Sequence, residues 1–313
     1  MFNTNKAKKY NKEITTIKLA AIAIFILGIL AGFNSKAQTK STTPTNLYAI
    51  TGNGLTDTSW IFGTYHLVNN SYLNEVPIVN KVFNKTKGVV VEIVMDSSKL
   101  MAAYTSGIMP DKKLTDLLDK PFSDSLDVEL KETIGTGLEQ LNQLKPMNIM
   151  IALSITYLMK DNESVIKKYT GKPLDVFFAD QGRLTGKSIT ALETIEEQMD
   201  ILFNKTSLEE QTNQLKSFIR TKNENIKSGN QLISSWFAHN LNKMYKISED
   251  AIKLYGGEDD LIKNRNDNWM KKLPTIISKE STFIAVGALH LAGSNGLITQ
   301  LEKLGYTLTP IKL

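Results

Sequence analysis

The feature that most constrains the fold is a series of short strand patterns separated by long helical patterns. Two apolar runs, 47–51 and 59–64, flank the turn-forming segment GNGLTD and predict a β-hairpin. Strands interleaved with helices are typical of a sheet covered by helices, so we predict an α/β fold with a central mixed sheet and flanking helices. A largely helical insertion is expected at about 97–180, and further strands are expected at 88–95, 187–192, 282–288 and 306–311.

The N-terminus has the pattern of a secretory signal. Residues 1–37 combine a lysine-rich start, an uncharged apolar run of fifteen residues at 19–33 and the small-x-small segment Ser35-Lys36-Ala37. This pattern predicts export to the periplasm, the cell surface or the medium. The apolar run is shorter than the roughly 20 residues of a membrane span. An uncleaved N-terminal anchor is the alternative, and it would attach the protein to a membrane. Residues 38–46 then form a polar tether, and 47–313 form the folded domain.

The formal charge of +5 comes from this leader. Residues 1–37 hold six Lys and one Glu, so removing them from 37 basic and 32 acidic residues leaves 31 of each. A protein that binds nucleic acid needs a basic excess on some face to neutralise phosphates. We therefore expect no nucleic-acid partner.

Two of the three histidines stand three residues after a glycine, each at the end of an apolar run. These motifs are Gly63 to His66 and Gly287 to His290. Each glycine allows backbones to approach closely at a strand end, so both imidazoles are expected to point into one crevice. A neutral imidazole binds Zn, Mn, Fe or Co. The alternative is a pair of buried histidines that bond to backbone groups.

Glu92 interrupts the segment VVVEIVM, in which both faces of a buried strand should be apolar. A lone buried carboxylate is costly unless a metal, an arginine or several N–H groups contact it. With His66 and His290, Glu92 would complete the two imidazoles, carboxylate and water of a catalytic metal site. The alternative is an edge strand on which Glu92 faces water.

Two further residues have the chemistry of an active site. Glu193 follows the predicted strand at 187–192 and is expected to act as a base or to orient a metal ligand. A negatively charged first helical turn is the alternative interpretation. Arg265 is one of only three arginines, and a guanidinium can clamp a carboxylate with two hydrogen bonds.

Together these segments resemble the TraB/GumN family, which includes the pheromone-shutdown proteins and the Tiki ectodomains. The resemblance runs from about Leu47 to Ile311. It implies a fold related to the erythromycin esterase and ChaN-like hydrolases. One departure is Ala191, where family members often have glycine. The matching segments are IFGTYHL, VVVEI, ALETIEEQ, NRNDNWM and VGALHLAGSNGLITQLEKLGY, in the family's order and spacing.

The resemblance also implies a metal-dependent protease activity in which His66, His290 and Glu92 are essential. Glu193 corresponds to the glutamate of the family's LET element, and Arg265 corresponds to the arginine of its RN element. Tiki-type members favour Mn or Co, and Zn is compatible with the same ligands.

We therefore expect an exported, metal-dependent hydrolase that acts as a peptidase on a peptide or protein. His66, Glu92 and His290 would hold a divalent ion, and Glu193 would serve as base or orient a ligand. Arg265 would bind a substrate carboxylate or the developing oxyanion. Two alternatives stay open: a module that binds peptides without cleaving them, and an accessory protein of surface polysaccharide production.

Overall fold

The computed structural model describes residues 44–94, 99–255 and 259–313. The predicted signal or anchor and residues 38–43 of the predicted tether lie outside these residues, so export stays a prediction. Among the described residues, none of the helices combines the length and the apolar character needed to cross a bilayer.

A six-stranded mixed sheet forms the centre of the fold, in the order β4-β3-β5-β2-β1-β6. The first two strands form the predicted hairpin, and β1 also pairs antiparallel with β6. The other pairs, β2 with β5, β5 with β3 and β3 with β4, are parallel. The predicted α/β fold is confirmed. The strands are β1 (Leu47–Gly52), β2 (Ser59–Thr64), β3 (Gly88–Val91), β4 (Ser188–Ala191), β5 (Thr282–Gly287) and β6 (Tyr306–Pro310).

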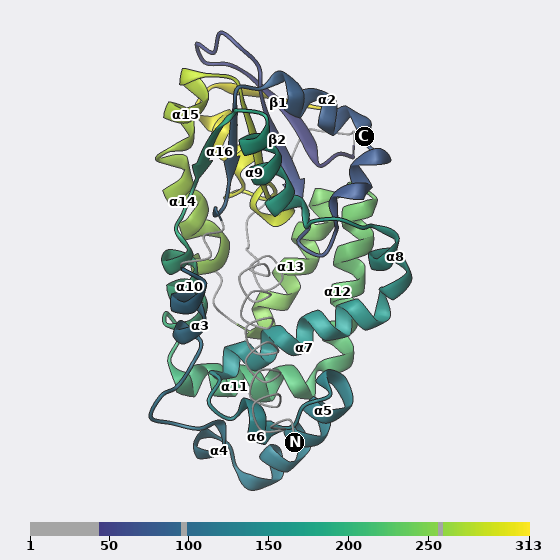
Figure 1. The fold of residues 1–313 in the computed structure, drawn as a ribbon, viewed down its shortest axis with the longest axis vertical. Coiled ribbons are helices and arrows are strands. Elements are labelled where there is room, and N and C mark those ends of the chain that lie inside the picture. The colour runs from purple at the N-terminus through teal and green to yellow at the C-terminus, as the bar shows by residue number, and fades with distance from the viewer. Residues whose placement is uncertain (1–43, 95–98, 256–258) are drawn as a thin grey trace, which may run out of the picture. The chain divides into compact units, whose positions relative to one another are not determined.

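Both faces of the inner strands are covered. Every residue of β3 and β5 is buried, as expected for parallel strands with helices on both sides. Helix α9 packs against β3, β4 and β5 and lies across the sheet in Figure 1. An aromatic cluster joins the helices to the sheet, with ring centroids 4.8 Å apart for Phe178 and Phe283 and 5.4 Å apart for Phe83 and Phe178.

The described chain forms two compact units. One contains the sheet, 161–194 and the C-terminal part from 224. Its helices are η1 (Asn70–Asn74), α2 (Pro77–Lys85), α8 (Glu163–Lys168), α9 (Leu174–Leu184), most of α12 (Lys222–Phe237), α13 (Leu241–Tyr255), η2 (Asp259–Lys263), α14 (Asn264–Met270), α15 (Leu273–Lys279), η3 (Ala288–His290) and α16 (Leu297–Lys303).

The other unit is helical and contains residues 99–160 and 195–223. The segment predicted as an insertion, 97–180, is largely helical where it is described, but residues 161–180 cluster with the sheet. Residues 195–223 instead join the helical unit. Its helices are α3 (Leu100–Ser106), α4 (Leu114–Leu117), α5 (Lys120–Ile134), α6 (Leu138–Leu141), α7 (Pro146–Asp161), α10 (Ile195–Phe203) and α11 (Leu208–Arg220).

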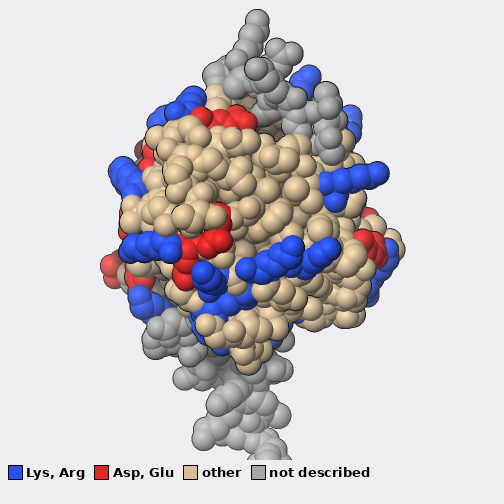
Figure 2. Space-filling model, turned by 90° about the horizontal axis from the view of Figure 1, so that it is seen from above, with Lys and Arg blue, Asp and Glu red and all other residues tan. Residues whose placement is uncertain are grey.

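The surface carries charges of both signs. Figure 2 shows one face on which basic and acidic side chains surround a broad area without charged residues. This mixture agrees with the equal numbers of acidic and basic residues after residue 37.

Candidate active site

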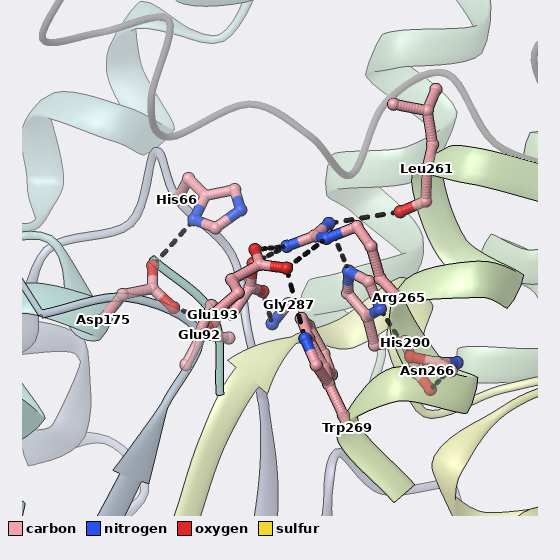
Figure 3. Close-up of polar contacts among 11 residues, drawn as sticks. His66, Glu92, Asp175, Glu193, Leu261, Arg265, Asn266, Trp269, Gly287 and His290 are labelled. Carbon is pink, nitrogen blue, oxygen red and sulfur yellow. Dashed lines mark hydrogen bonds and ion pairs between the residues drawn. The ribbon is translucent and has the colours of Figure 1, made fainter. Parts of the chain in front are cut away.

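Four of the predicted site residues follow the carboxyl ends of four neighbouring strands. His66 follows β2, Glu92 follows β3, Glu193 follows β4, and His290 ends η3 directly after β5. Because these strands are adjacent and parallel, their carboxyl ends lie along one edge of the sheet. Arg265 reaches the same place from α14, as Figure 3 shows. We call these five residues the strand-end cluster.

Glu92 is buried, but it does not lie inside a strand as the sequence predicts. Strand β3 ends at Val91, and Glu92 is the first residue beyond it. Its side chain accepts hydrogen bonds from the Gly287 N–H at 2.7 Å and from Arg265 Nη2 at 2.6 Å. These contacts supply the N–H and guanidinium donors that a buried carboxylate needs. The alternative of an exposed edge strand is wrong, because β3 is an inner strand and Glu92 is only 6% exposed.

Arg265 lies at the centre of the cluster, and all five of its N–H groups have acceptors. Nε donates to Glu193 Oε2 at 3.0 Å, and Nη2 donates to Glu92 Oε2 and to Glu193 Oε1. Nη1 donates to the Leu261 carbonyl at 3.2 Å and to His290 Nε2 at 2.9 Å. Burial would lower the pKa of Arg265, but Glu193 and Glu92 raise it, so the guanidinium stays charged. One permanent cation therefore faces two buried carboxylates.

The contacts of His290 determine its tautomer. A guanidinium has no acceptor, so His290 Nε2 must be the acceptor of the Arg265 contact. Its Nδ1–H then donates to Asn266 Oδ1 at 2.7 Å, and Asn266 Nδ2 donates to the His290 carbonyl at 3.1 Å. Burial, then the charges of Arg265 and His66, hold the pKa of His290 well below its ordinary value. His290 is therefore neutral, with its proton on Nδ1.

His66 has the opposite electrostatic setting. Its Nδ1 donates to Asp175 Oδ2 at 2.8 Å, and Thr64 Oγ1 donates to the other carboxylate oxygen. Burial would lower the pKa of His66, but the Asp175 carboxylate outweighs it, and Glu92 adds to the rise. Burial also opposes the charged form of Asp175 and would raise its pKa, but the contacts with His66 and Thr64 lower that pKa below its ordinary value. A carboxylate thus holds the ring of His66 in place.

The two motif glycines are needed for different close approaches. A Cβ on Gly63 would lie 3.0 Å from the Ala288 Cα, a backbone atom of the second motif. A Cβ on Gly287 would lie 3.1 Å from Glu92 Oε1, 3.6 Å from His66 Nε2 and 3.7 Å from His290 Cδ2. Glycine at 287 therefore leaves a space that Glu92, His66 and His290 all border.

A family model described as the TraB/PrgY/gumN family matches residues 46–310. The chain belongs to the TraB/PrgY/gumN family. This confirms the resemblance predicted from the sequence, and the matched region includes every strand of the sheet and the whole strand-end cluster. The comparisons with curated proteins and with solved structures give no match.

In this TraB/PrgY/gumN-family chain, sequence reasoning missed three side chains of the site. Asp175 interrupts the apolar segment LDVFF at the start of α9, and that lone carboxylate was the available signal. Asn266 and Trp269 stand in NRNDNWM with Arg265. Trp269 comes four residues after Arg265, hence on the same helix face, and its ring centroid lies 4.8 Å from the Arg265 guanidinium carbon. Trp269 Nε1 also donates to Glu193 Oε2 at 3.2 Å.

The donors gathered here have the chemistry of metal ligands, but their positions do not make a metal site. Two imidazoles and a carboxylate suit Zn, Mn or Co. Within the described ranges, however, no three His, Asp or Glu side chains converge where an ion could be held. Arg265 explains this, because it contacts both Glu92 Oε2 and His290 Nε2. As arranged, the cluster does not fit a divalent ion.

Proposed function

We propose that this family member is a hydrolase that cleaves peptide bonds at the strand-end cluster. One observation carries the proposal: His66 is fixed by a carboxylate through Nδ1, and its ring borders, together with Glu92 and His290, the space left by Gly287 at the carboxyl edge of the sheet. A stable core does not require two buried carboxylates, an arginine and two imidazoles in one place. Clusters of this kind are typical of sites where charge develops during a reaction.

In the proposed reaction, His66 is the general base. Asp175 accepts the Nδ1 proton, so Nε2 is the atom that takes a proton from the attacking water. The water oxygen bonds to the scissile carbonyl carbon, and the imidazolium then returns the proton to the leaving amine. Burial opposes protonation of His66, but Asp175 raises its pKa and so stabilises the imidazolium that forms when the water proton is taken up.

Arg265 acts in this proposal as a positioning residue. All five of its donors are directed at the protein's own groups, which leaves none for a substrate in this arrangement. Through these bonds it fixes Glu92, Glu193 and His290 relative to one another. The predicted roles of Glu193 as base and of Arg265 as oxyanion ligand stay predictions, and both require these contacts to rearrange.

Cleavage of a peptide library by the purified full-length protein, read by mass spectrometry, tests the proposal. We expect defined cleavage products from the wild type, and loss of those products in His66→Ala and in Glu92→Gln. The matched control is His239→Ala, because His239 lies outside the cluster and contacts Asn46. Cleavage that persists in His66→Ala would refute His66 as base.

A module that binds peptides without cleaving them is the second candidate. The observation in its favour is that Arg265 forms ion pairs with both Glu92 and Glu193, so these three charged groups bind one another. In the same experiment, a library peptide that is retained by the protein and recovered intact would support this alternative. The polysaccharide-production alternative stays a prediction.

Export belongs to the same proposal, whereas metal dependence is an alternative form of it. Mn, Co or Zn would be held by His66, Glu92 and His290 only once Arg265 has moved; His66 would then be a metal ligand, and Glu193 would replace it as base. The lysine-rich, apolar pattern of residues 1–37 supports export, so we propose a peptide or protein substrate outside the cytoplasm. The balance of acidic and basic residues supports the expectation of no nucleic-acid partner.

A further inference from the structure

We propose that Arg265 and a divalent metal ion are mutually exclusive occupants of the strand-end cluster. Arg265 is the resident cation, and an ion binds only when the guanidinium leaves. The inference concerns the site of the proposed function, but it does not depend on catalytic turnover.

The exclusion follows from the single lone pair that the His290 ring can offer. The Nδ1–H of His290 donates to Asn266, so Nε2 holds the only lone pair that the ring can offer. That lone pair accepts the Nη1–H of Arg265 at 2.9 Å. A nitrogen lone pair cannot bond to a metal ion and accept this hydrogen bond together. Coordination by His290 therefore requires Nη1 to withdraw.

Electrostatic repulsion also disfavours a metal ion while Arg265 is in place. The Arg265 Nη2 group lies 2.6 Å from Glu92 Oε2, and both side chains are nearly or wholly buried. A divalent ion on Glu92 would face this cation at short range where water screens little. Either cation alone is attracted by the two carboxylates, but the two cations together repel one another.

Arg265 also has contacts that a metal ion would not replace. Its guanidinium lies over the ring of Trp269 and donates to the Leu261 carbonyl. Trp269 in turn lies against His290, with ring centroids 4.2 Å apart. These contacts favour the arginine-occupied arrangement when the concentration of metal is low.

The test measures Mn²⁺ binding by isothermal titration calorimetry, without substrate. Arg265→Met keeps a long unbranched side chain and removes the cation, so we expect its affinity for Mn²⁺ to exceed that of the wild type by about tenfold or more. The gain should disappear in the double variant R265M/H290A. The matched control is Arg183→Met, because Arg183 is exposed and pairs with Asp180, and its Mn²⁺ binding should equal that of the wild type. A folded Arg265→Met that binds Mn²⁺ no tighter than the wild type overturns the proposal.

Arg265→Met leaves two buried carboxylates without their cation, so its folding must be measured in the same experiment. Near-ultraviolet circular dichroism and Tm should show that Mn²⁺ raises the Tm of Arg265→Met more than the Tm of Arg183→Met. If Arg265→Met does not fold even with Mn²⁺, NMR of the wild-type protein during a metal titration tests the proposal instead. The chain has only three arginines, at 183, 220 and 265, so the Nε–H signals of the wild type can be resolved by ¹⁵N-arginine NMR.

During a Zn²⁺ titration of the wild type, we expect the Arg265 Nε–H signal to change in step with binding. The absence of binding up to millimolar Zn²⁺ would overturn the proposal, because the cluster would then have no metal-bound state for Arg265 to exclude. Zn²⁺ binding with an unchanged Arg265 signal overturns the proposal. Because none of these measurements involves a peptide, failure of the peptidase proposal and failure of metal exclusion are separate results.

Discussion

The two Gly-x-x-His segments have the same motif and lie on neighbouring parallel strands, but their histidines differ in charge. His66 bonds through Nδ1 to the carboxylate of Asp175, and its pKa is raised despite burial. His290 bonds through Nδ1 to the carboxamide of Asn266, and its pKa is lowered by burial and by nearby cations. A repeated motif thus sets where an imidazole lies, whereas the charged groups around the ring set whether that imidazole takes up a proton.

The largest expected effect comes from giving His290 the partner that His66 has. Asn266→Asp removes the two hydrogen bonds that Asn266 Nδ2 donates and buries a carboxylate against the ring of His290. We expect the free energy of unfolding to fall by about 3 kcal/mol, as for other broken buried polar contacts. Urea denaturation measures the change. The control is Asn268→Asp on the exposed side of the same helix, and equal effects in both variants would contradict the special role of Asn266.

The converse change gives His66 a carboxamide partner. In Asp175→Asn the charge that raises the pKa of His66 is lost, so burial should bring that pKa below its ordinary value. We expect kcat/KM on a cleaved peptide to fall by roughly a hundredfold or more, because general acid–base catalysis contributes about 10²–10⁴-fold. Histidine NMR gives the pKa, and Asp180→Asn on the same helix is the control. An unchanged His66 pKa would show that Asp175 does not set it.

Substituting the two motif glycines, Gly63 and Gly287, compares how each Gly-x-x-His segment contributes to stability and to activity. Gly63→Ala drives a Cβ onto backbone at Ala288, so we expect a stability loss of about 1–3 kcal/mol. Gly287→Ala meets the Glu92 carboxylate, a side chain that can move, so we expect a smaller stability loss and about a tenfold loss of activity. Urea denaturation and kcat/KM measured on both variants separate these outcomes. The interpretation fails if Gly287→Ala is the less stable and the more active of the two.

The smallest effect is a difference in how stability depends on pH. The pKa of His66 is raised in the folded state, so its contribution is complete below about 6.5 and is lost as pH rises through the folded pKa. The pKa of His290 is lowered, so its contribution is complete above about 6.5 and is lost as pH falls toward the folded pKa. Each slope is limited to about 1.4 kcal/mol per pH unit.

Chemical denaturation across a pH series of His66→Gln and His290→Gln measures these slopes. Relative to the wild type, His66→Gln should flatten the loss of stability on the alkaline side, and His290→Gln should flatten the loss on the acid side. Curves that change on the same side in both variants would mean that the two histidines do not differ in charge.

Some of this site could be predicted because strand ends are visible in sequence. Apolar runs that close on Gly63 and Gly287 locate the carboxyl ends of β2 and β5, and a carboxylate after a β-branched run locates Glu92. Asp175 could not be assigned in the same way. It lies in a helix far from the strands in sequence, and only the packing of α9 on the sheet brings it to His66.

The sequence alone determined the α/β class, the hairpin, the family and the five residues of the strand-end cluster, because local periodicity and motif spacing set where strands end. Only the tertiary structure decided which cation pairs with Glu92 and Glu193, which tautomer His290 adopts and which histidine has a carboxylate partner. Those properties depend on contacts between α9, α14 and the strand ends. Electrostatic energies at such contacts change over a few ångströms, and no spacing along the chain encodes distances of that size.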